Sequence, residues 1–256
     1  MPDHRATAFR PLHFPDHPDP LGAVNMPVAD HLLRRGLLAD TARLSLHAGD
    51  PTTRLEDIRE ELFRQRWIEP PRHEQMPVTM GPQGAEVAQL DRSALRILGF
   101  WAQKVHINGL VETAGGSGPL VWISRRARQA PSNPGRWDTL IAGGRAVGYS
   151  IAQTAEKEGW EEAGIRPQNL AQLRRVGDMA VQYVSDRGFH QELLVIYDLT
   201  LPEDFRAICH DGEIEESARL PLPDLKALLN DPDQFKFSSY LILRDLIARH
   251  PAAVPV

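Results

Sequence analysis

The segment from Gly143 to Ile165 constrains the fold of this chain more than any other stretch. It opens with glycines at positions 143, 144 and 148, where the backbone can take positive φ angles or approach a ligand closely. Ser150 is a favoured N-cap residue, and Gly164 suits the position just after a helix. Small residues recur between them at helical spacing, which gives a narrow face able to pack close to a sheet. The strand-like run 137–142 precedes the loop, so we expect a strand, a glycine loop and a helix in succession.

Three carboxylates stand at the end of the predicted helix. Glu158, Glu161 and Glu162 are three and four residues apart, so they share one helix face. Like charges at this spacing repel, and acids in a last turn face the negative end of the helix dipole. A cation that prefers hard oxygen ligands, such as Mg²⁺ or Mn²⁺, would reverse this repulsion. The alternative interpretation is a solvated helix surface on which Lys157 pairs with Glu161.

The same segment resembles a Nudix box, whose pattern is G-x5-E-x7-R-E-U-x-E-E-x-G-U with U a bulky aliphatic residue. The matching positions are Gly143, Glu158, Glu161, Glu162, Gly164 and Ile165. Three positions depart from the pattern: Tyr149 replaces the first glutamate, Lys157 the arginine and Gly159 the aliphatic residue. Since its acidic half is intact, the segment is identified as a variant Nudix box.

The departures resemble the Nudix proteins related to thiamine pyrophosphokinase, and this similarity extends over nearly the whole chain. The motifs that carry it are HINGLV (106–111), VWISRR (121–126), PGRWDTLIAGG (134–144), YDLTLPEDF (197–205), DGEIE (211–215) and FKFSSYLILRDLIARH (235–250). Upstream, VADHLLRRG and the stretch 54–78 resemble the N-terminal domain of the same group. In some fungal members this unit precedes a kinase domain, and we expect none here because the sequence stops at Val256.

The resemblance implies a Nudix α/β/α sandwich with a mixed sheet, preceded by a small α+β domain. We expect the N-terminal domain at residues 1–104 and the Nudix hydrolase domain at residues 105–256. Apolar spacing predicts helices at 29–38, 54–66, 91–104, 222–229 and 238–249. Strands are predicted at 105–112, 120–124, 181–184 and 193–199.

The resemblance also implies which residues form the site. Glu158, Glu161, Glu162 and Lys157 are expected to be catalytic, and the three glutamates with Gly143 are expected to hold Mg²⁺ or Mn²⁺. The candidates for substrate binding are Arg125, Arg126, Glu213, Glu215 and Tyr149.

Each substrate-binding candidate has a plainer alternative. Guanidinium groups at Arg125 and Arg126 could hold phosphate oxygens or could simply end a solvated strand. The subfamily arginine aligns with Arg126, and a lysine common shortly after it is replaced by Ala130. Glu213 and Glu215 supply an extra metal ligand or a general base, or belong to an ordinary acidic loop.

Five residues outside the three glutamates also attract attention. Glu192 is either a strand acid directed at the site or an exposed side chain, and exposure is the commoner state. His106 and Asn108 resemble markers of the subfamily, and a histidine at a strand start usually serves as a structural hydrogen-bond partner. Tyr149 and Trp160 could stack on a heteroaromatic substrate, although core packing is the expected role of Trp160.

Composition limits the classes of function. A hydrophobic content of 42% and a charged content of 25% are ordinary for a globular protein. The formal charge of −5 argues against general nucleic-acid binding, and no run of residues has membrane-spanning length. The single cysteine, Cys209, cannot form an internal disulfide, and the N-terminus lacks the pattern of a signal peptide, so we expect a cytoplasmic protein. A homodimer is possible.

Only the resemblance indicates a substrate. It implies Mg²⁺-dependent hydrolysis of thiamine-type diphosphates to monophosphates, including damaged forms such as oxythiamine and oxothiamine diphosphate, as metabolite clean-up. One alternative is a MutT-like generalist that acts on nucleotide or isoprenoid diphosphates. Another is a Nudix domain that binds a ligand without turnover, for which Tyr149 and Gly159 are the best support. An isopentenyl-diphosphate isomerase is disfavoured because Cys209 is poorly placed for catalysis.

Overall fold

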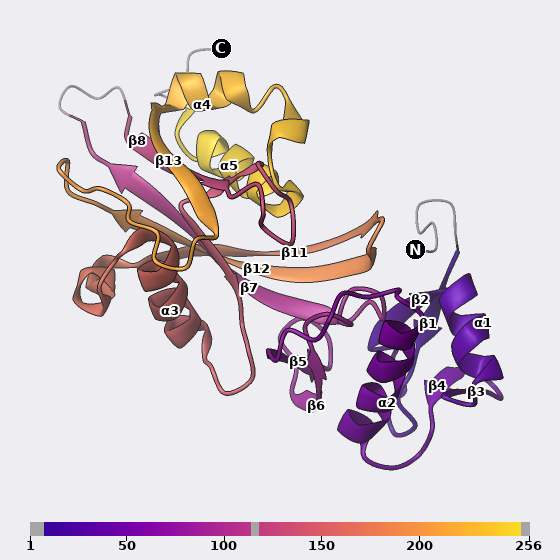
Figure 1. The fold of residues 1–256 in the computed structure, drawn as a ribbon. Coiled ribbons are helices and arrows are strands. Elements are labelled where there is room, and N and C mark those ends of the chain that lie inside the picture. Colours follow the sequence, from indigo (N-terminus) through magenta and orange to yellow (C-terminus); the bar gives the residue numbers. More distant parts are fainter. Residues whose placement is uncertain (1–7, 114–117, 252–256) are drawn as a thin grey trace. The chain divides into compact units, whose positions relative to one another are not determined.

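The computed structural model describes residues 8–113 and 118–251 (Figure 1). Contacts between Cα atoms divide the chain into two compact units. Unit 1 comprises Met1–Gln103, Arg145–Gly148 and Ala180–Leu193, and unit 2 comprises Lys104–Gly144, Tyr149–Met179 and Leu194–Val256.

Unit 1 is built from antiparallel two-stranded ribbons and two capped helices. The ribbons pair β1 (Phe9–Leu12) with β2 (Gly22–Asn25), β3 (Leu38–Asp40) with β4 (Leu44–Leu46), and β5 (Gln75–Thr79) with β6 (Glu86–Asp91). The helices are α1 (Met26–Arg34) and α2 (Pro51–Arg64). Each helix begins after a capping side chain: Asn25 accepts the Val28 N–H before α1, and Asp50 accepts the Thr53 N–H before α2. One apolar core, which includes Leu32, Ile58 and Phe100, joins these elements.

One predicted helix is wrong. Residues 91–104 do not form a helix, because the chain makes only turns after Asp91 and enters β7 (Trp101–Val111) at Trp101. The Asp91 carboxylate accepts the backbone N–H of Ser93 and also those of residues 72 and 73, so it organises a loop rather than a helix N-terminus. Gly99 then takes a left-handed φ of 66° and closes the turn. The predicted helix 29–38 is also too long, since α1 ends at Arg34 and Leu38 begins β3.

A seven-stranded sheet supplies the framework of unit 2. Its path runs β11 (Arg174–Ser185), β12 (Gly188–Thr200), β7, β8 (Leu120–Arg126) and β13 (Ile214–Pro221). Two short strands lie off this path: β9 (Trp137–Thr139) pairs with β8, and β10 (Ile141–Gly144) pairs with β7. The β7–β8 and β8–β13 pairs are antiparallel. β12 runs parallel to β7. Near the start of both strands the Gln191 side chain donates to the Gly99 carbonyl, and near their ends the Leu201 N–H donates to the Leu110 carbonyl.

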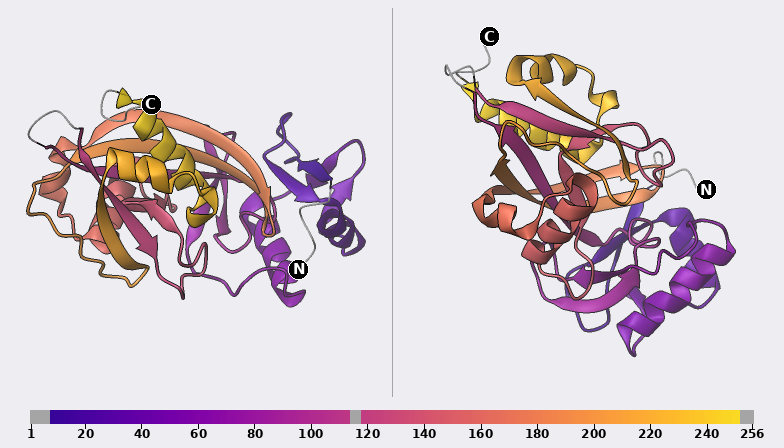
Figure 2. Two further views of the ribbon diagram at one scale, coloured as in Figure 1. Left: turned by 90° about the horizontal axis from the view of Figure 1, so that it is seen from above. Right: turned by 60° about the vertical axis from the view of Figure 1, so that its left-hand side comes forward.

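Helices cover both faces of the unit 2 sheet (Figures 1 and 2). On one face, α3 (Ile151–Ala163) packs Ala155 and Ala163 into a core with Val105 and Ile107 of β7. On the other face, α4 (Leu222–Leu228) and α5 (Phe237–Ala248) share a second core with strand residues that include Leu110 and Ile123. Two 3₁₀ helices complete unit 2, at Pro167–Gln172 and Pro232–Gln234. Alternate β7 side chains point to opposite faces, as expected for a buried strand.

The expected mixed α/β fold with a mixed sheet is confirmed. In the ranges that the structure describes, no helix combines the length and the apolar character needed to cross a membrane.

Candidate active site

Helix α3 begins and ends where its capping residues place it. The Ser150 hydroxyl accepts the Gln153 N–H, and the Gln153 side chain accepts the Ser150 N–H in return, which forms a capping box. Gly164 ends the helix in the left-handed conformation at φ 67°, and its N–H donates to the carbonyl of Trp160. The N–H of His210 donates to the Glu161 carbonyl at 2.7 Å, so the last turn also has a tertiary partner.

Glu158 lies directly against the strand end that precedes the helix. A Cβ atom added at Gly143 would stand 2.0 Å from the Glu158 Cδ and 2.5 Å from its Oε1. No side chain fits there, so the first glycine of the motif lets a carboxylate touch the backbone of β10. Glu158 and Gly143, which are 15 positions apart in the sequence (158 minus 143), therefore lie in direct contact.

Lys157 brings a positive charge to two of the three glutamates. Its Nζ lies 3.2 Å from Glu158 Oε1 and 2.5 Å from Glu161 Oε2. Burial lowers the pKa of the Lys157 ammonium, but the hydrogen bond to Glu161 and the charge of Glu158 outweigh this and raise the pKa above its usual value. The alternative interpretation that paired Lys157 with Glu161 matches this geometry, and the ammonium is shared with Glu158 as well.

Glu162 points into the protein. Only 3% of it is exposed, and its Oε2 accepts the Ala142 N–H at 2.7 Å, so it ties α3 to β10. Burial raises the pKa of the Glu162 carboxyl well above its usual value, and the negative charges of Glu158 and Asp138 raise it further. A positive charge brought to this carboxylate would oppose all three effects.

The residues fit a divalent cation by their chemistry. Glu158, Glu161 and Glu162 offer oxygen donors only, and the bare backbone at Gly143 lets the first of them lie against β10. Across residues 8–113 and 118–251, however, no group of three or more His, Cys, Asp and Glu side chains is arranged to hold a metal ion. In this arrangement the Lys157 ammonium lies between Glu158 and Glu161, and Glu162 turns to the Ala142 amide.

Sequence reasoning missed Asp138, which lies at the centre of a buried polar cluster in unit 2. Its carboxylate accepts hydrogen bonds from the Lys236 ammonium at 2.8 Å, from the Ser239 hydroxyl and from the Thr139 N–H. Burial favours the neutral acid, but Lys236, His106 and Arg126 outweigh it and lower the pKa of Asp138 well below its usual range. The only sequence signal was that these residues fall within the quoted subfamily motifs.

Arg126 connects this cluster to one of the predicted acids. Its guanidinium lies 3.8 Å from Asp138 and donates to Glu213 at 3.1 Å and to the Ser132 carbonyl at 2.9 Å. Since the Arg126 side chain is 6% exposed and the Glu213 side chain 44% exposed, the arginine is an internal anchor and the glutamate faces outward.

Arg125 and Glu215 lie on neighbouring strands of the same sheet. Arg125 is 4.0 Å from Glu215 and 3.5 Å from Glu216, and its guanidinium stands over the Trp137 ring. Glu215 also accepts the backbone N–H of Arg128. With 39% of its side chain exposed, Arg125 is the more accessible of the two predicted arginines.

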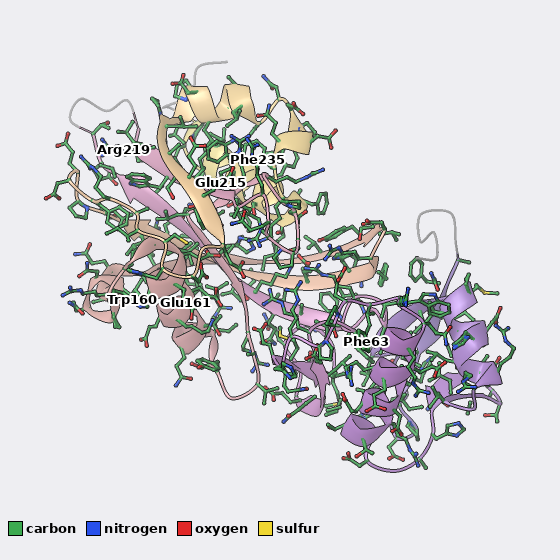
Figure 3. The ribbon with its side chains drawn as sticks, viewed as in Figure 1. Phe63, Trp160, Glu161, Glu215, Arg219 and Phe235 are labelled. Carbon is green, nitrogen blue, oxygen red and sulfur yellow. The ribbon has the colours of Figure 1, made fainter. Side chains whose placement is uncertain are left out.

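The aromatic candidates both reach the surface. Tyr149 is 42% exposed and immediately precedes the N-cap of α3. Core packing of Trp160 is a wrong prediction, because its side chain is 44% exposed and stacks on the ring of His210 at 4.3 Å (Figure 3).

Two other candidates are buried. Glu192 was expected to be an exposed strand residue; instead it is 2% exposed, lies in unit 1 and accepts the Tyr183 hydroxyl at 3.2 Å. His106 is fully buried in unit 2, and its Nδ1 lies 2.9 Å from the Thr139 hydroxyl.

The comparisons with known proteins agree with this architecture. A mixed α/β sandwich that carries a glycine loop and a capped acidic helix defines a Nudix-type fold. The family model of the NUDIX domain matches residues 104–241, which is more than half of the chain. The chain therefore belongs to the Nudix family. Nudix hydrolases act on phosphoric anhydride bonds and generally use divalent metal ions.

Two plant proteins and one solved structure are among the similar proteins. Nudix hydrolase 20, chloroplastic, of Arabidopsis thaliana is 31% identical over 201 residues, which cover 78% of this chain and 53% of that protein. Nudix hydrolase 24, chloroplastic, of the same plant is 30% identical over 179 residues, which cover 70% of this chain and 48% of that protein. The crystal structure of DR0079 from Deinococcus radiodurans covers 67% of this chain and 98% of its own, with a TM-score of 0.53 and 18% identity, a likeness of fold alone. The chain thus spans about half the length of these curated relatives.

Proposed function

We propose that this chain hydrolyses a diphosphate bond with Mg²⁺ or Mn²⁺ held by Glu158, Glu161, Glu162 and the Gly143 backbone. The observation that carries the proposal is the contact of Glu158 with Gly143, beside an ammonium group shared by Glu158 and Glu161. That ammonium marks a place where positive charge is stabilised. A divalent cation would bind there by displacing Lys157 from the carboxylates.

The chain's own groups would divide the work of hydrolysis. Once displaced, Lys157 would be available to a phosphate oxygen, and Arg125 is the more accessible guanidinium for the same purpose. One carboxylate, either Glu158 or the outward-facing Glu213, would accept a proton from the attacking water. When bound, the cation supplies charge neutralisation and lowers the pKa of a water molecule.

For the substrate we propose thiamine-type diphosphates, including damaged oxo and oxy forms, cleaved to the monophosphate as metabolite clean-up. Its support is the subfamily resemblance. The exposed rings of Tyr149 and Trp160 beside α3 are available to stack on a heteroaromatic group, and this use is part of the proposal. A generalist nucleotide or isoprenoid diphosphate hydrolase is the alternative within the same chemistry.

A Nudix domain without turnover is a second candidate that one observation favours. Lys157 already offsets one of the two negative charges of Glu158 and Glu161, so the site holds a cationic group without a metal. Such a domain would bind a diphosphate or a partner and release it unchanged.

One assay separates these functions. Purified protein is incubated with Mg²⁺ and a panel of thiamine, oxothiamine, nucleoside and isopentenyl diphosphates, and monophosphate and phosphate release are measured. Preferential cleavage of oxothiamine diphosphate supports the proposed substrate, and equal rates across the panel support the generalist. No release from any compound, with binding still detected, supports the domain without turnover.

Three further properties are proposed with this function. The domains divide at residues 104 and 105, the protein forms a homodimer, and it works in the cytoplasm. The plant relatives carry the description chloroplastic, so a fluorescent fusion imaged in the source cell is the direct test of location.

A further inference from the structure

Unit 1 contains a small pocket with an unusual concentration of positive charge. Four of its lining residues are arginines that come from three separate segments: Arg72, Arg92, Arg96 and Arg187. Trp67 and Glu69 also line it, and its internal volume is about 50 Å³. One water molecule needs roughly 10–15 Å³ by the same kind of measure, so the space suits a group of about four oxygen atoms.

Side-chain hydrogen bonds and an ion pair hold together the segments that carry these arginines. The buried Asp91 carboxylate accepts backbone N–H groups from Arg72 and Ser93, and so connects the first two segments. Glu74 pairs with Arg92 at 2.7 Å and adds a second connection between them. Gln191 donates to the Gly99 carbonyl at 2.6 Å, which fixes the hairpin that carries Arg187 against the turn that carries Arg96.

The pKa of Arg96 reflects burial and electrostatic repulsion between the arginines. Burial lowers the pKa of its guanidinium, Glu192 and Tyr183 oppose that change, and the like charges of Arg92 and Arg187 lower it again. Among the lining residues of the pocket, Glu69 is the acid. Four arginines and one acid therefore line the pocket, and two acids outside the lining, Glu74 and Glu192, act on Arg92 and Arg96.

From this arrangement we propose that unit 1 binds the phosphate group of a small phosphorylated molecule in the pocket lined by Arg72, Arg92, Arg96 and Arg187. Guanidinium groups present planar sets of N–H donors that match phosphate oxygens, and a tetrahedral anion accepts from several at once. A dianion would remove the mutual repulsion of the arginines and fill the available volume. This proposal is independent of the diphosphate hydrolysis proposed for unit 2.

The test is a calorimetric titration of the full chain with inorganic phosphate in metal-free buffer that contains EDTA. Chelation removes the cation on which phosphate binding at the α3 carboxylates would depend. Arg72→Gln and Arg187→Gln each remove one lining charge, whereas Arg66→Gln removes the same charge from an exposed residue beside the pocket that does not line it. Methyl phosphate is titrated in parallel, to distinguish a site for free phosphate from a site for phosphate esters.

We expect phosphate to bind the unaltered chain and the Arg66→Gln variant equally. The dissociation constant should rise about tenfold or more in Arg72→Gln and in Arg187→Gln, since each loses a charge-assisted hydrogen bond. Circular dichroism and thermal midpoints verify folding, and two variants are used so that misfolding of one leaves the other informative. Methyl phosphate that binds as well as phosphate supports a phosphorylated molecule as the ligand, and methyl phosphate that does not bind would overturn that assignment. No detectable binding, or an equal effect of all three substitutions, would overturn the proposal.

Discussion

At the scale of single residues, substitution of the glutamates of α3 distinguishes a catalytic metal site from a solvated charged surface. If Glu161 and Glu162 hold the cation, then Glu161→Gln and Glu162→Gln should each lower kcat/KM by roughly a hundredfold or more at saturating Mg²⁺. The amide keeps the size of each side chain and one acceptor oxygen, so the variant removes the negative charge with little change in shape. Steady-state hydrolysis of the best substrate in the panel gives the measurement.

Helix α3 offers a matched control for this prediction. Glu156 lies on the same helix and is exposed, so Glu156→Gln removes an equal charge outside the acidic face and should leave kcat/KM within about twofold. If all three variants keep full activity at saturating Mg²⁺, the metal assignment fails.

Asp138 gives a second prediction at this scale, on stability. Its substitution by asparagine would leave Lys236 and Arg126 facing a neutral group inside unit 2. Breaking a buried charge pair usually costs about 3 kcal/mol or more, so Asp138→Asn should lower the free energy of unfolding by about that amount. Urea denaturation followed by circular dichroism measures it. The exposed Asp233→Asn variant should change it by less than about 0.5 kcal/mol, and equal effects at both positions would contradict the assignment.

These residues also show where sequence reasoning stops at a site. The spacing of Glu158, Glu161 and Glu162 along one helix is a local property, so it could be predicted. The pairing of Asp138 with Lys236 spans 98 positions, and no local pattern encodes it. Helical spacing also does not reveal that buried Glu162 accepts the Ala142 N–H while Glu161 pairs with the Lys157 ammonium.

At the scale of elements, Gly159 makes a prediction about α3 itself. A Cβ atom at this buried position would lie 3.7 Å or more from its nearest neighbours, Leu170, Ile141 and Ile165, which is ordinary contact. Glycine inside a helix is about 1 kcal/mol less favourable than alanine. Gly159→Ala should therefore raise the free energy of unfolding by roughly 0.5–1 kcal/mol in urea denaturation. Lower stability would mean that close packing of α3 on the sheet requires glycine.

Elements with explicit caps were predictable, and elements defined by tertiary contacts were not. Ser150 and Gly164 mark the ends of α3 in the sequence, and the structure uses both. Asp91 also has the character of a cap, but its carboxylate serves three backbone N–H groups of a loop, so the predicted helix does not form. The run 137–142 divides into β9 and β10 at Leu140, because its two parts pair with different strands.

At the scale of the whole molecule, the sequence predicted the class of fold but not how the two units share the chain. The resemblance indicated a mixed sheet between helices, and that architecture is present. The segments Arg145–Gly148 and Ala180–Leu193 group with unit 1, although the chain has already entered unit 2 before each. Such excursions depend on contacts such as Arg145 with Glu86 and Gln191 with Gly99, which join residues 59 and 92 positions apart.

Carboxylates with depressed pKa values occur in both units, so acid should destabilise the whole molecule. The hydrogen bond from His31 is the main cause of the lowered pKa of Glu61 in unit 1. In Asp91, hydrogen bonds from Ser93 and from backbone N–H groups outweigh burial, which acts in the opposite direction. Asp138 adds a depressed carboxyl in unit 2. A group whose pKa is lower in the folded state binds fewer protons there, so its contribution to stability is present above the unfolded pKa of about 4 and is lost as the pH falls through the folded value.

We therefore expect the urea midpoint to fall steadily from about pH 5 to about pH 2.5, with each unit of pKa depression worth about 1.4 kcal/mol. Glu162, whose pKa is raised, contributes with the opposite sign: its share is present in acid and is lost as the pH rises through its folded pKa. The comparison with Asp138→Asn isolates one group, because asparagine does not titrate. The difference in free energy of unfolding between the unaltered protein and Asp138→Asn should be largest near pH 7. It should become smaller in acid, because protonation of Asp138 removes the same charge. A gap that stays constant from pH 7 to pH 2.5 would show that the carboxylate charge contributes nothing and that Asp138 acts through packing alone.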